Sequence, residues 1–522
     1  MAGRRRPGRV STRPGLRRRD LLAAAGGLAL GALAGRLDPP RSAPAFLRDR
    51  PLVTHGVQSG DVTADGGVVW ARADRPARMW VELGDRAGVR VRGPVVGAES
   101  DHTAKVVLRG LPPGTDVPFR VRFEDLDAPG VVSEPAEGTI RTAPADARSV
   151  SFLWSGDLGG QGWGIDPAAG GYRIFRAMAA VGGDFFLFSG DTVYADMPLT
   201  ATVPLPGGGT WRNLVTPAKA AVAETLDEYR GQYAYNLEDE AFRAFAAAVP
   251  QVNQWDDHEV ANGWYGGEVL DDPRRREQRV DVLAPRAKQA FFEWVPTHPR
   301  VARRQTVYRR ISHGPLLDVF VVDMRTFRDP NGPDRYADPR RGLLGAVQRA
   351  WLERELAAST ATWKVLANDL PLGLVIPDGP GPDGAAQGLE GPPLGRELEF
   401  AEILQRAQAG GVTGIVMLTA DVHYAAAHRY DPARGSAGEF TPFWEFVAGP
   451  LNAAPGQPRA LDPTFGPEVV FATASAPDGA SPRDGHQYFG EVSIDGSTRV
   501  MTVRLRDIDG AVVYAVDLPP GA

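Results

Sequence analysis

Residues 184–196 have the sequence DFFLFSGDTVYAD, and this stretch is the most informative about the fold. It opens with Phe185 to Phe188, a short apolar run of the kind that a strand buried on both faces needs. The run ends at Gly190, and Asp191 and Tyr194 follow closely. Because open α/β sheets bind ligands at the carboxyl ends of strands, this carboxylate and phenol indicate a binding site. Hard oxygen donors suit Fe(III), Ca²⁺ or Mg²⁺, although a polar turn after a core strand has the same pattern.

Four further apolar stretches are predicted strands, and each of them also ends in groups that can bind a metal or an anion. Amphipathic stretches such as 172–181 and 397–410 predict helices long enough to connect parallel strands. Because strand ends of one sheet converge in space, five weak signals together indicate one site. The four further ends are Asp157; Asp256-Asp257-His258-Glu259; Asp323 with Arg325; and Asp421 with His423.

These groups have the chemistry of a dinuclear metallohydrolase. In such a site a bridging carboxylate holds two cations a few Å apart, and a metal-bound hydroxide attacks phosphorus in line. Asp421 and His423 are two residues apart, so on an extended strand end both side chains point the same way. Asp256 is expected either to support a ligand or to lie on the surface.

A chain of 522 residues is too long for one hydrophobic core, so more than one domain is expected. Residues 46–146 contain short alternating strands around a Leu-Pro-Pro-Gly-Thr turn, which predicts an all-β sandwich of the immunoglobulin or fibronectin III type. From residue 147 onward, strands alternate with helices. The predicted division is therefore a targeting segment at 1–45, the sandwich at 46–146 and a catalytic domain at 147–522.

The N-terminal segment resembles a Tat export signal. Arginines crowd residues 4–19, and the pair Arg18-Arg19 precedes a mildly apolar run from Leu21 to Ala34. The run is too short for a stable membrane span, although an uncleaved anchor and a basic disordered tail are alternatives. The segment predicts a partnership with the Tat machinery and an extracellular, periplasmic or cell-wall location.

Charge and composition exclude several classes of function. Without residues 1–45, which hold ten Arg and two Asp, 48 basic and 62 acidic residues remain and the net charge is −14. This balance argues against binding to nucleic acid or to anionic membranes. A phosphate site must therefore bring its own local positive charge, which metal ions would supply. The chain has no cysteine, so disulfides and thiolate metal sites are excluded.

Four short motifs together resemble those of a known enzyme family. They are Ser155-Gly156-Asp157, Gly190-Asp191-x-x-Tyr194, Asp256-Asp257-His258-Glu259 and Ala420-Asp421-x-His423. Their order is similar to that of the calcineurin-like metallophosphoesterases and, more narrowly, of the alkaline phosphatase D family. The resemblance covers nearly the whole chain, and it implies a Tat signal, a β-sandwich N-terminal domain and a four-layer α/β/β/α catalytic domain.

The resemblance also implies a set of metal ligands. Asp191 would bridge two metals, Tyr194 and His423 would bind Fe(III), and Asp257 and Asp421 would bind Ca(II) or another divalent ion. Ligation by oxygen alone is what Ca²⁺ prefers.

One family feature is absent. Better-known members carry a cysteine at the first motif as an apparent iron ligand, whereas this chain has Gly156 there. We expect Asp157 to take the ligand role, which leaves the identity of the first metal open.

Two residues are candidates for catalysis. By the resemblance, His258 would bond to the phosphate and protonate the leaving group as a general acid. Arg325, from its position alone, is a candidate to clamp a phosphate oxygen, with a structural ion pair to Asp323 as the alternative.

The expected function is that of a secreted metal-dependent phosphohydrolase acting on phosphomonoesters, phosphodiesters or both. A phospholipase D-type phosphodiesterase is an alternative within the same chemistry. A secreted binding protein with a decayed catalytic domain is the alternative from another class. The loops at 200–216 and 376–396 would form the substrate walls, and the Gly/Pro-rich second loop is predicted to be a surface loop or lid.

Overall fold

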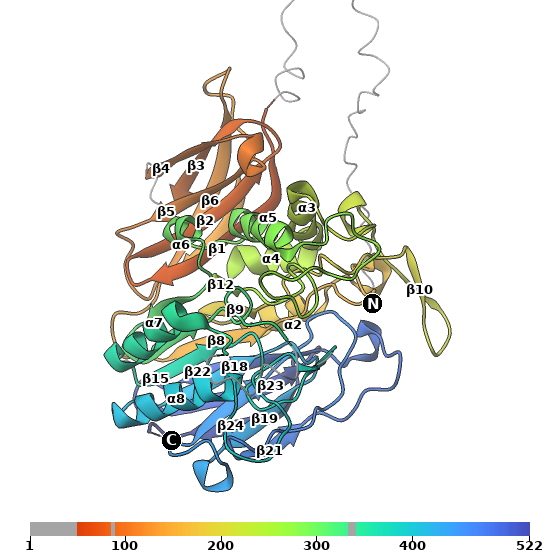
Figure 1. Cartoon of the computed structure of the whole chain (residues 1–522). Coiled ribbons are helices and arrows are strands. Elements are labelled where there is room, and N and C mark those ends of the chain that lie inside the picture. Colours follow the sequence, from red (N-terminus) through yellow and green to blue (C-terminus); the bar gives the residue numbers. More distant parts are fainter. Residues whose placement is uncertain (1–49, 85–88, 332–340, 380, 522) are drawn as a thin grey trace, which may run out of the picture. The chain divides into compact units, whose positions relative to one another are not determined.

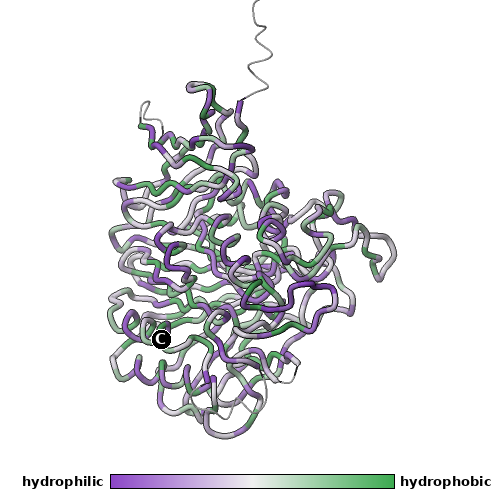
Figure 2. The backbone as a smooth tube through the Cα atoms, turned by 45° about the horizontal axis from the view of Figure 1, so that its top comes forward, coloured by the Kyte–Doolittle hydropathy of each residue, from purple (hydrophilic) through white to green (hydrophobic). Residues whose placement is uncertain are grey.

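The computed structural model describes residues 50–84, 89–331, 341–379 and 381–521. The predicted export segment at 1–45 lies outside them. Three large sheets and the helices that cover them make up the described residues (Figure 1). Hydrophobic stretches alternate with hydrophilic ones along the tube in Figure 2, and none of the described helices is long and apolar enough to cross a membrane.

The N-terminal strands form the predicted β-sandwich. Val69 and Ala71 on one layer and Met79, Val81 and Val121 on the other are buried in one apolar cluster, as strands with one inward face require. The first layer contains β1 (Val53–Thr63), β2 (Gly66–Ala73) and β5 (Thr103–Leu108). The second has the order β4 (Arg90–Val96), β3 (Ala77–Leu83), β6 (Asp116–Asp125) and β7 (Ala136–Arg141).

The first layer of the sandwich continues into a nine-stranded sheet, because Gly60 of β1 bridges Gln251 of the next strand in parallel. The order is β24-β23-β22-β8-β9-β12-β1-β2-β5, and β8, β9 and β12 pair in parallel. The new strands are β8 (Val150–Ser155), β9 (Phe185–Ser189), β12 (Gln251–Gln254), β22 (Tyr488–Ile494), β23 (Met501–Asp507) and β24 (Val512–Leu518).

A second, seven-stranded sheet has the order β13-β14-β15-β18-β20-β19-β21. Its central strands β14, β15, β18 and β20 are parallel. The strands are β13 (Arg309–His313), β14 (Leu317–Val321), β15 (Trp363–Ala367), β18 (Ile415–Thr419), β20 (Phe443–Val447), β19 (Ala426–Tyr430) and β21 (Pro467–Ala472).

The two sheets stack, and helices cover their outer faces. In β14, Val319 and Val321 join the core shared with the nine-stranded sheet, whereas Phe320 joins the core under α7 (Gly345–Ala358) and α8 (Arg396–Ala409). In β9, Phe186 packs on Phe245 of a helix, whereas Phe185 contacts His313 of β13. The apolar run at 185–188 is thus buried on both faces, as predicted. The remaining helices are α2 (Ile174–Val181), α3 (Leu226–Asn236), α4 (Glu240–Ala248), α5 (Val280–Trp294) and α6 (Pro299–Arg304).

This arrangement confirms the predicted fold class, a β-sandwich followed by a layered α/β/β/α region. Arg50–Ala522 form one compact unit, and the division at residue 146 stays a prediction.

Within the 376–396 stretch, residues 388–392 are exposed as a surface loop would be, but one part of the stretch departs from that prediction. Residues 383–387 are buried. They follow the short strands β16 (Pro377–Asp378) and β17 (Gly381–Pro382) and precede helix α8 in the sequence. Burial is possible because Asp383 pairs with two arginines, Arg325 and Arg328, and Arg396 bonds to its backbone carbonyl. Charged partners distant in sequence thus offset the cost of burying this polar stretch.

Candidate metal centre

A first group of possible metal ligands consists of Asp157, Asp191 and His423, which follow β8, β9 and β18. Each offers one donor atom, and these atoms lie within 4.8 Å of one another. The Nε2 atom of His423 is 3.4 Å from Asp157 Oδ1 and 2.9 Å from the Tyr194 hydroxyl. Ligand atoms that share one ion at bond lengths of about 2.0–2.1 Å lie about 3 Å apart. The spacing of these donors therefore fits a single cation.

Two side chains of this group are held in place by their neighbours. Nδ1 of His423 donates to the carbonyl oxygen of Ala454 at 2.6 Å, which leaves the Nε2 lone pair toward Asp157 and Tyr194. The Tyr194 ring stacks on His258 at a centroid distance of 4.3 Å. Gly160 packs on the same ring so closely that a Cβ there would lie 2.4 Å from it.

Asp157 is fully buried, and neither of its carboxylate oxygens has a hydrogen-bond partner among the described residues. A buried carboxylate in this state is costly unless a cation compensates it. The preceding Gly156 has no room for a side chain, because a Cβ would lie 2.8 Å from Ala420 Cβ. Asp157 is thus the group that the end of β8 presents to the site.

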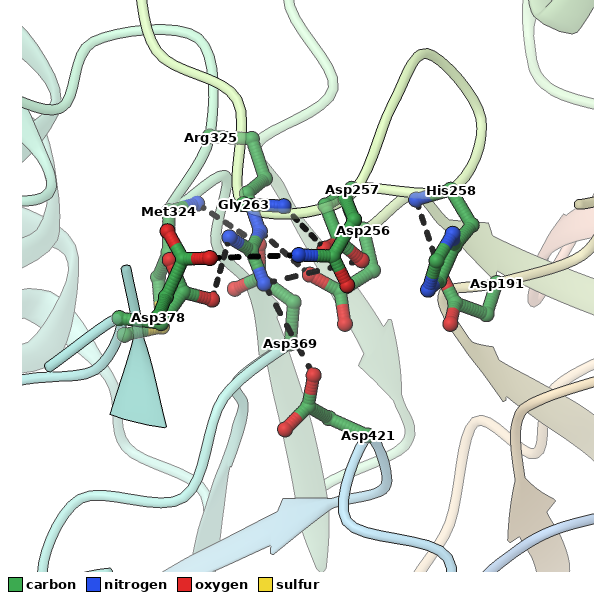
Figure 3. Close-up of polar contacts among 12 residues, drawn as sticks. Asp191, Asp256, Asp257, His258, Gly263, Met324, Arg325, Asp369, Asp378 and Asp421 are labelled. Carbon is green, nitrogen blue, oxygen red and sulfur yellow. Dashed lines mark hydrogen bonds and ion pairs between the residues drawn. The ribbon is translucent and has the colours of Figure 1, made fainter. Parts of the chain in front are cut away.

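A second set of donors adjoins the first. Asp191, Asp257 and His258 form one group, and Asp256, Asp257 and Asp421 form another. Asp191 links the first group to the second, and Asp257 links the second to the third. The three groups therefore form one connected series of donors. Figure 3 shows Asp191 and His258 on one side of Asp257, with Asp421 approaching from the loop after β18.

The electrostatics of these groups fit cations. Burial and the neighbouring carboxylates of Asp256 and Asp257 raise the pKa values of Asp191 and Asp421 well above the ordinary range. Asp257 Oδ2 accepts a bond of 2.6 Å from the Gly263 amide, and Oδ1 has no hydrogen-bond partner in the described part of the chain. Bound cations would keep such carboxylates ionised.

The backbone is strained at four of the donors. Asp157, Asp191, Asp421 and His423 have φ values of 67°, 48°, 65° and 62°. This left-handed region costs a non-glycine residue about 1–2 kcal/mol. The sequence-based expectation of an extended end after β18 is wrong, because the strand stops at Thr419. Asp421 and His423 therefore do not lie on an extended strand end, and they enter different donor groups.

His258 is oriented by a residue to which the sequence analysis gave no role. Its Nδ1 lies 2.8 Å from Asp196 Oδ1, and Asp196 Oδ2 accepts a bond from the Asn262 amide. Burial by itself lowers the pKa of His258, but the carboxylates of Asp196 and Asp257 overcome this and raise it to about 9. Asp196 is the last residue of the stretch 184–196, and its acidic side chain five residues after Asp191 is the signal that the sequence offers for it.

Arg325 is fully buried among acidic side chains. Its Nε donates to Asp256 at 2.6 Å and its Nη1 to Asp383 at 2.7 Å, while Nη2 is 3.8 Å from Asp257 and from Asp421. Asp323 is not its ion-pair partner, because that carboxylate accepts bonds from the Trp255 indole and the Thr326 hydroxyl. Asp256 is likewise buried at the site and not on the surface. Asp383 was missed by the sequence analysis, since an acid in a Gly/Pro-rich loop carries no distinguishing signal.

Two stacked mixed sheets with carboxylates, histidines and a tyrosine at their strand ends define the metallophosphoesterase class. Residues 152–505 match the family model described as PhoD-like phosphatase, and residues 40–144 match that of the PhoD-like phosphatase N-terminal domain. The chain therefore belongs to the PhoD-like phosphatase family, which confirms the resemblance drawn from its motifs.

Three known proteins are similar to this chain in sequence or in fold. The chain is 28% identical over 401 residues to alkaline phosphatase D of Bacillus subtilis (strain 168), a match that covers 71% of this chain and 64% of that protein. Among solved structures, one described as the structure of PhoD matches with a TM-score of 0.65 and 21% identity, covering 89% of this chain and 88% of that one. Purple acid phosphatase PPD1 from yellow lupin (Lupinus luteus) seeds matches with a TM-score of 0.57 and 15% identity, covering 90% and 74%. At these identities the two structures show the shared fold.

Proposed function

We propose that this protein is a metal-dependent phosphohydrolase that cleaves phosphomonoesters, phosphodiesters or both. The observation that carries the proposal is the continuous series of donors, buried at Asp157, Asp191 and Asp257 and half-buried at Asp421. Within the described part of the chain, both oxygens of Asp157 and one of Asp257 lack hydrogen-bond partners. Their position at the strand ends of a PhoD-like phosphatase fold supports the same conclusion.

The donor chemistry suggests two different cations. Asp157, Asp191, Tyr194 and His423 would hold Fe(III), which suits a phenolate and an imidazole. Asp191 would bridge to Ca(II), held further by Asp257 and Asp421 through oxygen atoms alone. When bound, such a pair neutralises charge on phosphoryl oxygens and activates water.

The chain's own residues would then orient the substrate and supply a proton. Asp196 engages Nδ1 of His258, so Nε2 is the nitrogen available to the substrate. We propose that His258 bonds to the phosphoryl group and protonates the leaving oxygen. Arg325 is enclosed by Asp256 and Asp383, so its burial argues against a direct phosphate clamp and for a supporting role.

The location and partners of the protein also belong to this proposal. Residues 1–45 suggest export through the Tat machinery, which would place the domains at 46–146 and 147–522 outside the cytoplasm. Phosphate esters are the proposed substrates.

The proposal is tested on purified full-length protein by metal analysis together with hydrolysis of an aryl phosphate and a bis-aryl phosphate. We expect two bound metals per chain, turnover of at least one substrate, and a loss of about 100-fold or more in kcat/KM for Asp191→Asn. Tyr194→Phe removes the phenolate ligand, so any violet absorption from phenolate-bound Fe(III) disappears.

Three outcomes would contradict parts of this proposal. Wild-type protein with no tightly bound metal, together with an active Asp191→Asn variant, refutes the metal-dependent function. A violet colour that survives Tyr194→Phe refutes that ligand assignment. Release of choline from phosphatidylcholine vesicles, with no turnover of the aryl esters, favours the phospholipase D-type activity instead.

A further inference from the structure

Asp383 reaches the metal centre from a segment that the family motifs do not include. Its side chain is 5% exposed. One oxygen accepts Nη1 of Arg325 at 2.7 Å, and the other lies 2.8 Å from Nη2 of Arg328. Its backbone carbonyl accepts a bond of 2.8 Å from Arg396. The carboxylate is thus held firmly while it binds Arg325.

Two of the three guanidinium nitrogens of Arg325 make short bonds to carboxylates, and the third does not. Nε and Nη1 make short bonds to Asp256 and Asp383, which are carried by different loops. Nη2 has no hydrogen-bond partner among the described residues, and it lies 3.8 Å from one oxygen each of Asp257 and Asp421. That separation is too long for a hydrogen bond.

A guanidinium free to move would not stay at that distance. Charge-assisted bonds between arginine and carboxylate close to about 2.7–2.9 Å. The two carboxylates near Nη2 attract it, and the bonds of Nε to Asp256 and of Nη1 to Asp383 resist the movement. Because Nη2 stays at 3.8 Å, Oδ1 of Asp257 makes no hydrogen bond to any described residue and stays available to a cation.

We propose that Asp383 is a positioning residue, which holds Arg325 away from Asp257 and Asp421 and so keeps the second cation subsite open. The inference rests on the proposed function, because it assumes that those two carboxylates bind a metal. Arg325 in turn keeps Asp256 paired. Without Asp383, its guanidinium would close onto the metal ligands and compete with the cation.

The experiment is a double-mutant cycle with metal affinity as its readout. Wild type, Asp383→Asn, Arg325→Gln and the double variant are stripped of metal, and Ca²⁺ is then titrated with binding measured by calorimetry and by metal analysis. We expect Asp383→Asn to weaken the second cation at least about tenfold, the usual scale for a residue behind a metal ligand. In the Arg325→Gln background the same substitution has no further effect, because Asp383 acts through Arg325.

The matched control is Asp378→Asn. Asp378 lies in the same segment, but it accepts bonds from Asn331 and Asn262 instead of from Arg325. We expect this variant to keep both cations with wild-type affinity. Circular dichroism and the melting temperature of each variant show whether the fold is intact. If Asp383→Asn does not fold, Asp383→Glu replaces it in the cycle, because one added methylene moves the carboxylate but keeps its charge.

Two results would overturn the inference. The first is an Asp383 variant that binds both cations as tightly as wild type. The second is a loss of affinity that persists unchanged in the Arg325→Gln background. A wild-type protein that binds no cation refutes the proposed function itself, so the two failures are distinguishable.

Discussion

Asp191 shows at the scale of one residue how the site is made. β9 ends one residue before Gly190, and a left-handed turn at Asp191 then directs its carboxylate toward both donor groups. The same backbone conformation recurs at Asp157, Asp421 and His423. Such strain persists only where packing enforces it. Two glycines leave the space that this packing needs. Gly449 lies against Asp157, and Gly160 lies against the neighbouring predicted ligand Tyr194.

Substitution of Gly160 by alanine tests this packing. A Cβ at this position would lie 2.4 Å from the Tyr194 ring, so the ring must shift and its hydroxyl contact with His423 is disturbed. We expect a loss of about 1–3 kcal/mol in unfolding free energy, typical of overpacking, together with weaker metal binding. Urea unfolding and metal analysis measure the two effects. Gly266→Ala is the control, because a Cβ there meets no atom within 4 Å; equal metal binding in the two variants would contradict the prediction.

At the scale of elements, the segment between β15 and α8 connects the site to the outer helix layer. Two acidic side chains bond to residues 387–394 of this segment. Glu397 accepts hydrogen bonds from Gln387 and Leu394, and Asp462 accepts one from the Gln387 amide. Burial, and then the nearby charge of Asp462, raise the pKa of Glu397 to about 8. The stability of this segment should therefore depend on pH.

The direction of this pH dependence follows from proton linkage. An unfolded glutamate titrates near about 4.3, so above that pH the unfolded chain has lost the proton that folded Glu397 keeps up to about 8. Its contribution to stability is complete below the unfolded pKa, and it declines as pH rises until it is lost above about 8. The decline is on the order of 5 kcal/mol.

Urea unfolding at pH 5 and pH 8.5 measures this decline. We expect Glu397→Gln to remove a large part of the difference between the two pH values, because glutamine remains neutral. Glu402→Gln, a half-exposed position of the same helix paired with Arg349, should leave the difference as in wild type. A wild-type pH dependence in Glu397→Gln would show that this carboxyl is not the group responsible.

At the scale of the whole molecule, the β-sandwich is bonded to the region that carries the site. The carbonyl oxygens at the end of α5 accept bonds from three sandwich side chains, those of Gln58, Trp70 and Lys105. Asp61 of β1 makes a buried ion pair of 2.8 Å with Arg309 of β13. Arg309 also donates to the backbone of Asn253, in the strand that leads to Asp256 and Asp257. We infer that the sandwich braces the catalytic region and unfolds together with it.

Substitution of Asp61 by asparagine tests this coupling. It leaves the buried Arg309 charge without its acidic partner, which costs about 3–5 kcal/mol in comparable sites. We expect one cooperative urea transition at a lower midpoint, seen equally by fluorescence and circular dichroism. Glu137→Gln, in an exposed pair with Arg120, should not move the midpoint. Two separate transitions in wild type would argue against a shared unfolding unit.

Local sequence patterns determined much of this protein. Apolar runs such as 185–188 and 414–418 predicted buried strands, because burial on both faces requires continuous apolar residues. The acids, histidines and tyrosine after those strands predicted the members of the site, since strand ends of a sheet converge. Six predicted ligands, Asp157, Asp191, Tyr194, Asp257, Asp421 and His423, lie in or against the donor groups of the structure.

The way these members pair depends on the three-dimensional fold. The guanidinium of Arg325 binds Asp256 and Asp383, 58 residues or more away in sequence, and only its backbone amide bonds to its neighbour Asp323. Asp421 and His423 enter different groups because left-handed turns replace an extended end. Residues 383–387 are buried because distant arginines neutralise Asp383. Charge pairing and backbone strain depend on contacts between remote segments, and no local pattern encodes which segments meet.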